Sequence, residues 1–351
     1  MRSLSANSIY RAELDLVSRQ VPLDALRGRR VLVTGASGLV GSAVVDLLLH
    51  LNRLYDACIG VVAAGRTREK LVRRFGMDGQ ITFAAYDDVL AGMGSGGFDC
   101  AVLAASPASP EIYVNDPGSV VKANTSDVSS ILSSIRSREG KNVVYVSSSE
   151  VYGDLVAPEG GYAEDEFGEI DDSSARSCYA ISKRRAEVIC RGFADSGLHV
   201  VVVRPGHVYG PTASRQDRRV SSAWAYDAAF GKDIVMKSDG RQLRSYVHCL
   251  DCASAILVAM CCGKAGEPYN VSNRDSVISI RDMAEILSDA GGVRLLMELP
   301  TDSERRAFNP MINSSLNALK LERLGWTGMI GAKRGFSETV AVLREDSEAA
   351  A

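Results

Sequence analysis

The sequence predicts an α/β protein built on a doubly wound parallel sheet, with a smaller lobe formed by its C-terminal part. Short apolar segments alternate with amphipathic ones from Arg30 to Arg204, and the apolar segments are nearly continuous runs of strand length. Such strands are typical of a parallel sheet that helices cover on both faces. The 351 residues, 46% of them apolar, suffice for one large domain that carries a smaller lobe.

The expected elements follow in order along the chain. Residues 9–27 have helical spacing, and residues 1–27 are expected to form a helical extension that packs outside the sheet. The expected strands are 31–34, 59–64, 81–85, 100–104, 142–147 and 200–204, and the expected helices are 39–51, 68–75, 120–138 and 179–196. The sheet domain is assigned to residues 28–204 with 241–265, and the smaller lobe to residues 205–240 with 266–345.

Composition argues against several classes of protein. The formal charge is −3 and no block of Lys or Arg stands out, so a nucleic-acid partner is not expected. No apolar run approaches the ~20 residues that cross a bilayer. Acidic residues interrupt the N-terminal segment, which therefore does not resemble a signal peptide, and a cytoplasmic protein with eight reduced cysteines and no metal site is expected.

A glycine-rich turn follows the first expected strand. Gly35, Gly38 and Gly41 have GxxGxxG spacing, which differs from the GxGxxG fingerprint, and a helix follows at once. A dinucleotide pyrophosphate must approach the N–H groups of a helix N-terminus, and a Cβ at the close positions would block it. The turn therefore predicts a Rossmann domain whose cofactor contacts are Gly35, Ser37, Gly38, Leu39, Val40 and Gly41.

The end of the second strand bears on the choice between NAD and NADP. An NAD site usually has Asp or Glu there for the ribose hydroxyls, whereas this chain has Gly65-Arg66. Arg66 could pair with a 2′-phosphate or stack on adenine, which favours NADP, or it could be a solvated surface residue. Asp87 or Asp88, after the third strand, could contact adenine.

Tyr179 and Lys183 lie four residues apart on one expected helix. A free phenol has a pKa near ~10 and is a poor base at neutral pH. A neighbouring ammonium, together with a cationic nicotinamide, stabilises the phenolate, so that Tyr179 can take a hydroxyl proton as hydride leaves the same carbon. Ser147, Ser148 and Ser149 end a sheet strand, where their hydroxyls either share the hydrogen bond of the reacting oxygen or cap a turn.

These motifs resemble the extended short-chain dehydrogenase/reductase family of nucleotide-sugar epimerases, dehydratases and decarboxylases. Further matching segments are Glu150-Val-Tyr-Gly153, Arg204-Pro-Gly-His-Val-Tyr-Gly-Pro211, Arg244-Ser-Tyr-Val-His-Cys-Leu-Asp251, Gly266-Glu-Pro-Tyr-Asn270 and Leu324-Gly-Trp326. The resemblance implies a bound NAD, a nucleotide-diphosphate sugar as substrate and a homodimer formed through the two helices 118–138 and 178–196.

The resemblance also implies a role for individual residues. Ser148 matches the catalytic Ser/Thr, Tyr179 the base and Lys183 its partner, while Arg244, with Arg219 as a second contact, matches the arginine that holds the diphosphate. His207 stands where relatives use an asparagine to bind substrate, and is either a substrate contact or a packed loop histidine. The remaining cofactor contacts that it implies are Ala104, Ala105, Ser106, Asn124 and Pro205.

Within the family, the motifs resemble those of UDP-glucuronate decarboxylases (UDP-xylose synthases). The shared segments are Ala105-Ser-Pro-Ala-Ser-Pro110, Ser148-Ser149-Glu150 and Arg176-Ser-Cys-Tyr179. A 4,6-dehydratase needs an acid where Ser149 stands, whereas a decarboxylase does not, because oxidation of C4 makes the C6 carboxylate a β-keto acid. Glu150 could position water or the pyranose ring during that step, and Ser149 would contact the substrate.

Four other functions stay open at this point. A 4-epimerase needs only Ser148, Tyr179 and Lys183 with room for the 4-keto sugar to turn over. A 4,6-dehydratase is disfavoured by Ser149, and a simple NADP-dependent reductase is compatible with Arg66. A non-catalytic nucleotide-binding regulator is disfavoured because a binding protein has no need for the Tyr179 base.

Overall fold

A computed structural model describes residues 4–77, 79–92, 97–107, 109–137, 142–301 and 311–348. Seven parallel strands form its main sheet in the order β10-β6-β5-β4-β1-β2-β3. The bounds are β1 (Arg30–Thr34), β2 (Gly60–Gly65), β3 (Ile81–Ala85), β4 (Cys100–Leu103), β5 (Asn142–Val146), β6 (His199–Pro205) and β10 (Pro268–Val271). The strand order reverses between β1 and β4, and this reversal is where doubly wound folds bind ligands.

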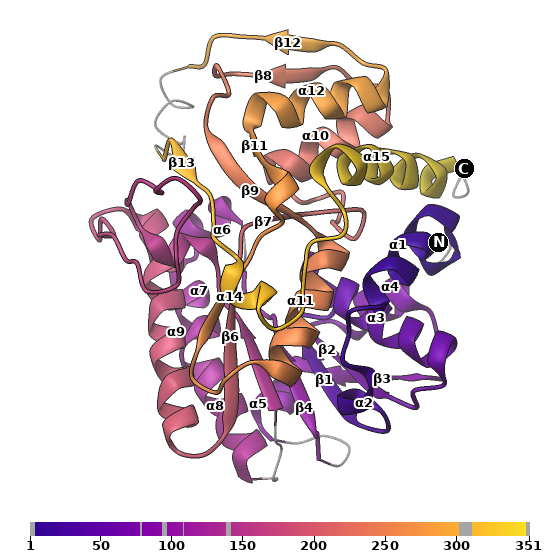
Figure 1. Cartoon of the computed structure of the whole chain (residues 1–351), viewed down its shortest axis with the longest axis vertical. Helices are drawn as coiled ribbons and strands as arrows, with labels where there is room; N and C mark the ends of the chain where they lie inside the picture. Colours follow the sequence, from indigo (N-terminus) through magenta and orange to yellow (C-terminus); the bar gives the residue numbers. More distant parts are fainter. Residues whose placement is uncertain are drawn as a thin grey trace.

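Helices cover both faces of this sheet (Figure 1). Val31 and Val33 of β1 face a core with α3 and α11, while Leu32 between them faces a core with α8 and α9, as the two-residue period of a strand requires. The doubly wound α/β fold is thereby confirmed. The helices of this domain are α3 (Leu39–Tyr55), α4 (Arg68–Phe75), α5 (Tyr86–Leu90), α6 (Pro110–Asn115), α7 (Pro117–Asn124), α8 (Ser126–Ser137), α9 (Cys178–Asp195) and α11 (Cys249–Cys262).

The smaller lobe lies at the top of Figure 1, above the large sheet. Its own core is formed mainly by α10, α12 and α15 with the strands beside them. The strands are β7 (His207–Tyr209), β9 (Leu243–His248), β11 (Val277–Ser279) and β13 (Asn313–Ser314) in one sheet, and β8 (Ile234–Met236) with β12 (Leu295–Met297) in another. The helices are α10 (Val220–Ala229), α12 (Ile280–Gly291) and α15 (Ala332–Glu348), and α14 (Leu319–Glu322) packs near β10.

Two strands differ from the division drawn on the sequence. Residues 266–345 were assigned to the smaller lobe, but β10 (268–271) pairs with β6 as the seventh strand of the large sheet. Residues 241–265 were assigned to the sheet domain, but β9 (243–248) pairs with β7, β11 and β13 of the smaller lobe. Strand pairing joins residues far apart in the chain, so a local pattern does not show which sheet a strand enters.

Two expected helices are each divided in the structure. The segment 9–27 forms α1 (Ser8–Ser18) and α2 (Leu23–Leu26), separated at Pro22, which has no N–H to continue a helix. Residues 120–137 belong to α7 and α8, which meet at Thr125, and residue 138 lies outside the described residues. No helix among the described residues is long and apolar enough to cross a membrane.

The N-terminal helix α1 packs on α3 and α11, outside the large sheet, and buries one of its faces there. Tyr10 and Leu14 are fully buried against α3 and α11. The Tyr10 hydroxyl donates to Asp46 of α3 at 2.8 Å, and Asp46 also pairs with Arg74 of α4. The buried carboxylate of Asp46 therefore links α1, α3 and α4.

Candidate active site

The glycine-rich turn joins β1 to α3 and is closely packed. Gly35 has a φ of +66°, which favours glycine, and a Cβ there would lie 2.7 Å from the Ala104 oxygen. A Cβ on Gly41 would lie 2.3 Å from the Gly35 oxygen. Gly38 is the N-cap of α3 and provides no side chain to cap it, so the first-turn N–H groups remain for a ligand. The turn thus fits the pyrophosphate of a dinucleotide.

The loop after β4 lies against this turn. The N–H groups of Ala104 and Ala105 donate to the Thr34 hydroxyl at 3.2 and 3.3 Å. Thr34 is the last residue of β1, so its hydroxyl holds the two loops beside each other. The expected cofactor contacts Ala104, Ala105 and Ser106 are therefore next to the glycine turn, at the point where the strand order reverses.

Along the same edge of the sheet, past the glycine turn, the charged residues expected near adenosine are exposed. Gly65 is the last residue of β2, and a Cβ there would contact the Leu71 side chain at 3.3 Å. Arg66 is exposed, as are Asp87 and Asp88 in the first turn of α5. The side chains of Arg66, Asp87 and Asp88 could contact a ligand, but no hydrogen bond to another described residue fixes their orientation.

Tyr179 and Lys183 lie on α9 and are almost fully buried, at 7% and 3% exposure. The Lys183 ammonium donates to the Val146 oxygen at 2.7 Å and lies 4.6 Å from the centre of the Tyr145 ring and 5.7 Å from that of Tyr179. Burial lowers the pKa of Lys183 to about 7, and the Glu187 carboxylate opposes this change. The phenol and the ammonium are thus adjacent, as the four-residue spacing predicted.

Burial raises the pKa of Tyr179 to about 12, and the Glu150 carboxylate adds to the rise. A hydrogen bond with Ser148 and the charge of Arg219 act in the opposite direction. The protein alone therefore keeps this phenol neutral. A bound cationic nicotinamide would supply the further positive charge that a phenolate base needs.

Ser148 precedes a 3-10 turn, η2 (Ser149–Tyr152), and its hydroxyl accepts the N–H of Glu150 at 3.2 Å. Ser149 is 8% exposed. Glu150 pairs with Arg176 at 3.4 Å, and burial raises the pKa of this carboxyl while Arg176 lowers it. Arg176 lies in η3 (Ala175–Ser177), immediately before α9. This turn therefore brings a hydroxyl and a carboxyl to the Tyr179 phenol.

Two residues of this region were not singled out as site residues in the sequence. Tyr113 of α6 stacks on Tyr179 with ring centres 4.6 Å apart and planes 13° apart. Arg176 matched a motif but was given no role. Tyr113 follows the Ser-Pro-Ala-Ser-Pro segment by three residues, which is the only signal that could have identified it.

Three of the four expected substrate contacts, His207, Arg219 and Arg244, come from the smaller lobe, whereas Ser149 lies in η2. His207 of β7 lies opposite Tyr246 of β9, and Arg244 is two residues earlier on β9. Burial lowers the pKa of His207 to about 3, and the charges of Arg244, Arg219 and Arg176 lower it further. The imidazole is therefore neutral, and the three guanidinium groups are close enough to act on it together. Such a group of cations suits a ligand with several negative charges.

Arg244 and Arg219 are held in different ways. Arg244 is 3% exposed and donates to the Leu243 oxygen at 2.8 Å. Arg219 is the N-cap residue of α10 and donates through Nε to the Asp217 carboxylate at 3.0 Å. The contacts of both with a diphosphate stay predictions.

Asn124 and Pro205 complete the expected cofactor contacts. Asn124 is fully buried, donates to the Ser182 hydroxyl at 3.0 Å and accepts from the Tyr145 hydroxyl at 3.3 Å. Its amide therefore joins α7 to α9 and β5, and its contact with a cofactor stays a prediction. Pro205 ends β6 beside β10.

No group of three or more His, Cys, Asp or Glu side chains within the described ranges could hold a metal ion. The cysteines at 58, 100, 178, 190, 249, 252, 261 and 262 are all free thiols.

Comparison with known proteins agrees with this geometry. The model of the NAD dependent epimerase/dehydratase family matches residues 31–272. UDP-glucuronic acid decarboxylase 1 of Xenopus tropicalis is 28% identical over 335 residues, which cover 91% of this chain and 73% of the relative. UDP-glucuronic acid decarboxylase 6 of Arabidopsis thaliana is 26% identical, over 88% of this chain and 86% of the relative.

Solved structures show the same fold. The dTDP-glucose 4,6-dehydratase DesIV of Streptomyces venezuelae, with NAD bound, has a TM-score of 0.75 at 23% identity and covers 91% of this chain and 98% of that one. UDP-glucose 4-epimerase of Thermotoga maritima, with UDP-glucose, has a TM-score of 0.74 at 22% identity and covers 91% and 99%. The resemblance drawn from the sequence motifs is confirmed: the chain is an enzyme that belongs to the NAD dependent epimerase/dehydratase family.

Proposed function

We propose that this enzyme converts a nucleotide-linked glucuronate to the corresponding pentose, the reaction of a UDP-glucuronate decarboxylase. The observation that carries the proposal is the Ser149–Glu150 pair beside Tyr179, with Arg176 at 3.4 Å from Glu150. A 4,6-dehydratase needs an acid at position 149 to protonate a leaving hydroxide. A serine there suits a reaction in which carbon dioxide, rather than water, leaves.

The side chains supply the proton transfers of this reaction. The Tyr179 phenolate takes the proton of the C4 hydroxyl, and Ser148 shares the hydrogen bond to that oxygen. A nicotinamide held beside Tyr179 and Lys183 would supply the hydride acceptor for the oxidation of C4 and the hydride donor for its later reduction. The C6 carboxylate then leaves as carbon dioxide, its bonding electrons form the C4–C5 enolate, and a proton from water adds to C5. Tyr179 returns its proton to the C4 oxygen when the ketone is reduced.

NAD is the cofactor that this cycle favours, because an enzyme that recycles its own hydride usually keeps NAD. Gly35, Gly38 and Gly41 would hold the pyrophosphate, and Tyr179 with Lys183 would face the nicotinamide ribose. The exposed Arg66 instead favours the 2′-phosphate of NADP. Mass spectrometry of the nucleotide released from denatured protein decides between the two.

The decisive test is carbon dioxide release from UDP-glucuronate by the purified enzyme. The proposal expects release at the rate of pentose formation, with no net consumption of NAD. Turnover of UDP-glucose or dTDP-glucose without carbon dioxide release would instead assign an epimerase or a dehydratase. Stoichiometric oxidation of added NADPH would assign a reductase. Glu150→Gln separates the carboxylate's role from that of Tyr179, since it should slow decarboxylation and leave cofactor binding intact.

We also infer a homodimer that pairs α7, α8 and α9. Val188 of α9 is 71% exposed and Val121 of α7 is 38% exposed, and these helices pack side by side. Apolar side chains exposed together on neighbouring helices favour burial by a second copy. Val188→Glu should lower the mass in solution from dimer to monomer, and a wild-type monomer at micromolar concentration would contradict the inference.

A further inference from the structure

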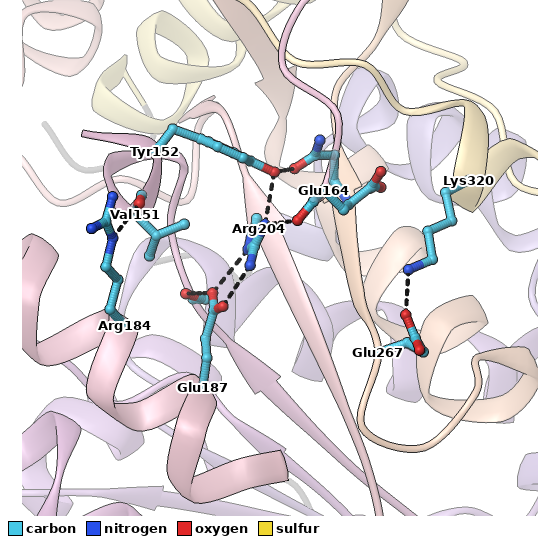
Figure 2. A network of polar contacts seen from close by, with 10 residues as sticks. Val151, Tyr152, Glu164, Arg184, Glu187, Arg204, Glu267 and Lys320 are labelled. Carbon is cyan, nitrogen blue, oxygen red and sulfur yellow. Dashed lines mark hydrogen bonds and ion pairs between the residues drawn. The ribbon is translucent and has the colours of Figure 1, made fainter. Parts of the chain in front are cut away.

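A group of polar side chains around Arg204 connects α9 to the turn that follows β5 (Figure 2). It includes Glu187, one helical turn after Lys183 on α9. Glu187 accepts hydrogen bonds from the Ser147 hydroxyl at 2.6 Å and from Arg204 at 3.0 and 2.7 Å. Both carboxylate oxygens are therefore occupied, and one of them is bonded to the residue that precedes Ser148.

Arg204 connects Glu187 to the far end of the same turn. The other terminal nitrogen of Arg204 donates to the Tyr152 hydroxyl at 3.0 Å and to the main-chain carbonyl oxygen of Glu164 at 2.8 Å. Tyr152 in turn donates to Asn270 of β10 at 2.6 Å. Arg204 is 2% exposed. The Glu187–Arg204 ion pair thus contacts the turn at two points. One is Ser147, which precedes Ser148, and the other is Tyr152, which follows Glu150.

The same helix holds this turn at two more points. Arg184, next to Lys183, donates to the Val151 oxygen at 2.6 Å. Lys183 itself donates to the Val146 oxygen at 2.7 Å. Residues 146, 147, 151 and 152 are therefore all bonded to α9 or to its partner Arg204, and Ser148, Ser149 and Glu150 lie between them.

Stability alone is a poor explanation for such a pair. The free energy lost when two charges are removed from water can be as large as the free energy gained from their attraction. A protein in which a well-packed apolar pair replaces a buried ion pair is therefore often equally stable. The Lys320–Glu267 pair in Figure 2 differs in this respect, because its side chains are 32% and 34% exposed and so lose less hydration. A buried ion pair that contacts both ends of the turn is better explained by its effect on the orientation of Ser148 and Glu150, which lie in that turn.

We propose that Glu187, fixed by Arg204, is a positioning residue for the reaction: it holds the Ser147–Tyr152 turn against α9, so that Ser148 and Glu150 meet the Tyr179 phenol. Glu187 touches neither substrate nor cofactor in this role. Its charge has a second effect on the same helix, because it opposes the lowering of the Lys183 pKa by burial. The choice of substrate in the kinetic test rests on the proposed decarboxylase function.

The test compares Glu187→Gln with Glu187→Asp, which keeps the charge. Glu187→Gln should lower kcat on UDP-glucuronate on the order of 10²-fold, as a displaced catalytic group does, with KM changed less than about threefold. The alkaline limb of its pH–kcat profile should move to lower pH, because Lys183 loses its proton earlier. Glu187→Asp should restore part of kcat and the position of that limb.

Asp46→Asn is the matched control, since Asp46 is a buried carboxylate paired with Arg74 that contacts no reactive residue. It should lower the thermal midpoint as Glu187→Gln does but leave the pH profile in place. Should Glu187→Gln not fold, Ser147→Ala removes only the link to the turn and should lower kcat by a smaller factor.

A second measurement does not depend on the substrate. Hydrogen–deuterium exchange of a peptide covering residues 144–153 should be faster in Glu187→Gln and unchanged in Asp46→Asn. Unchanged exchange, or equal losses of kcat and stability in both variants with the same pH profile, would overturn the proposal. Faster exchange in an enzyme that does not turn over UDP-glucuronate would uphold the positioning role and reject the decarboxylase.

Discussion

The two ends of the predicted cofactor site are built differently. At the reactive end, Tyr179 and Lys183 are buried and each contacts a neighbouring aromatic ring or carbonyl. At the adenosine end, Arg66, Asp87 and Asp88 are exposed. Proton transfer requires side chains held within a few tenths of an ångström, whereas an exposed charge can meet a flexible phosphate by adjusting its own rotamer.

This difference in burial affects the reaction class and the cofactor preference differently. The reaction class rests on buried groups whose positions depend on many contacts. Cofactor preference rests on exposed groups that can change at little cost to stability. Substitutions of the buried groups should therefore have larger effects on turnover than substitutions of the exposed ones.

Tyr179→Phe should cause the largest loss. The ring still stacks on Tyr113, but no group remains to take the C4 proton, so kcat should fall by about 10⁴-fold. Cofactor binding, measured by fluorescence titration, should stay within about twofold of the wild type. A variant that retained a tenth of the wild-type rate would show that another residue is the base.

Gly41→Ala should damage both ends of the site, because the added Cβ would lie 2.3 Å from the Gly35 oxygen. Overpacking of this kind costs about 1–3 kcal/mol in the free energy of unfolding, and the dinucleotide should bind weakly. Gly192→Ala is the control: nothing lies within 4 Å of a Cβ added there, in the last turn of α9, so helix propensity should make the change slightly stabilising. Urea unfolding of the two variants checks both outcomes.

His207→Asn should change how stability depends on pH. The folded-state pKa of His207 is about 3 and the unfolded value is about 6.5, so between these values the unfolded chain binds a proton that the folded chain does not. The free energy of unfolding therefore falls as pH falls through this window, by up to about 1.4 kcal/mol per pH unit for one proton. The variant should lose that part of the slope in urea unfolding at pH 4, 5 and 6. An unchanged slope would mean that His207 is accessible to protons in the folded state.

Arg66→Ala should have the smallest effect. An exposed charge contributes little, so affinity for NADP relative to NAD should fall by only about fivefold, with the thermal midpoint and kcat unchanged. Isothermal titration with each cofactor measures the ratio. Equal affinities before and after the change would assign Arg66 to the surface rather than to a 2′-phosphate.

Some parts of the site could be predicted from sequence because their partners are close in the chain. Tyr179 and Lys183 are one helical turn apart, and the three glycines share one turn, so a local pattern suffices. Tyr113 and Arg204 are different, since their contacts with Tyr179 and Glu187 join separate elements. The same reason explains why a local pattern does not show which sheet β9 and β10 join.

The sequence by itself determined the alternation of strands and helices, the glycine turn and the phenol–ammonium pair, because each depends on spacing within one or two turns of backbone. Only the tertiary structure decided that Tyr10 of α1 bonds to Asp46 of α3, that Arg176, Arg219 and Arg244 gather around His207, and that Glu187 contacts Ser147. Burial and charge act through space, and the packing of distant segments sets the distances on which they depend.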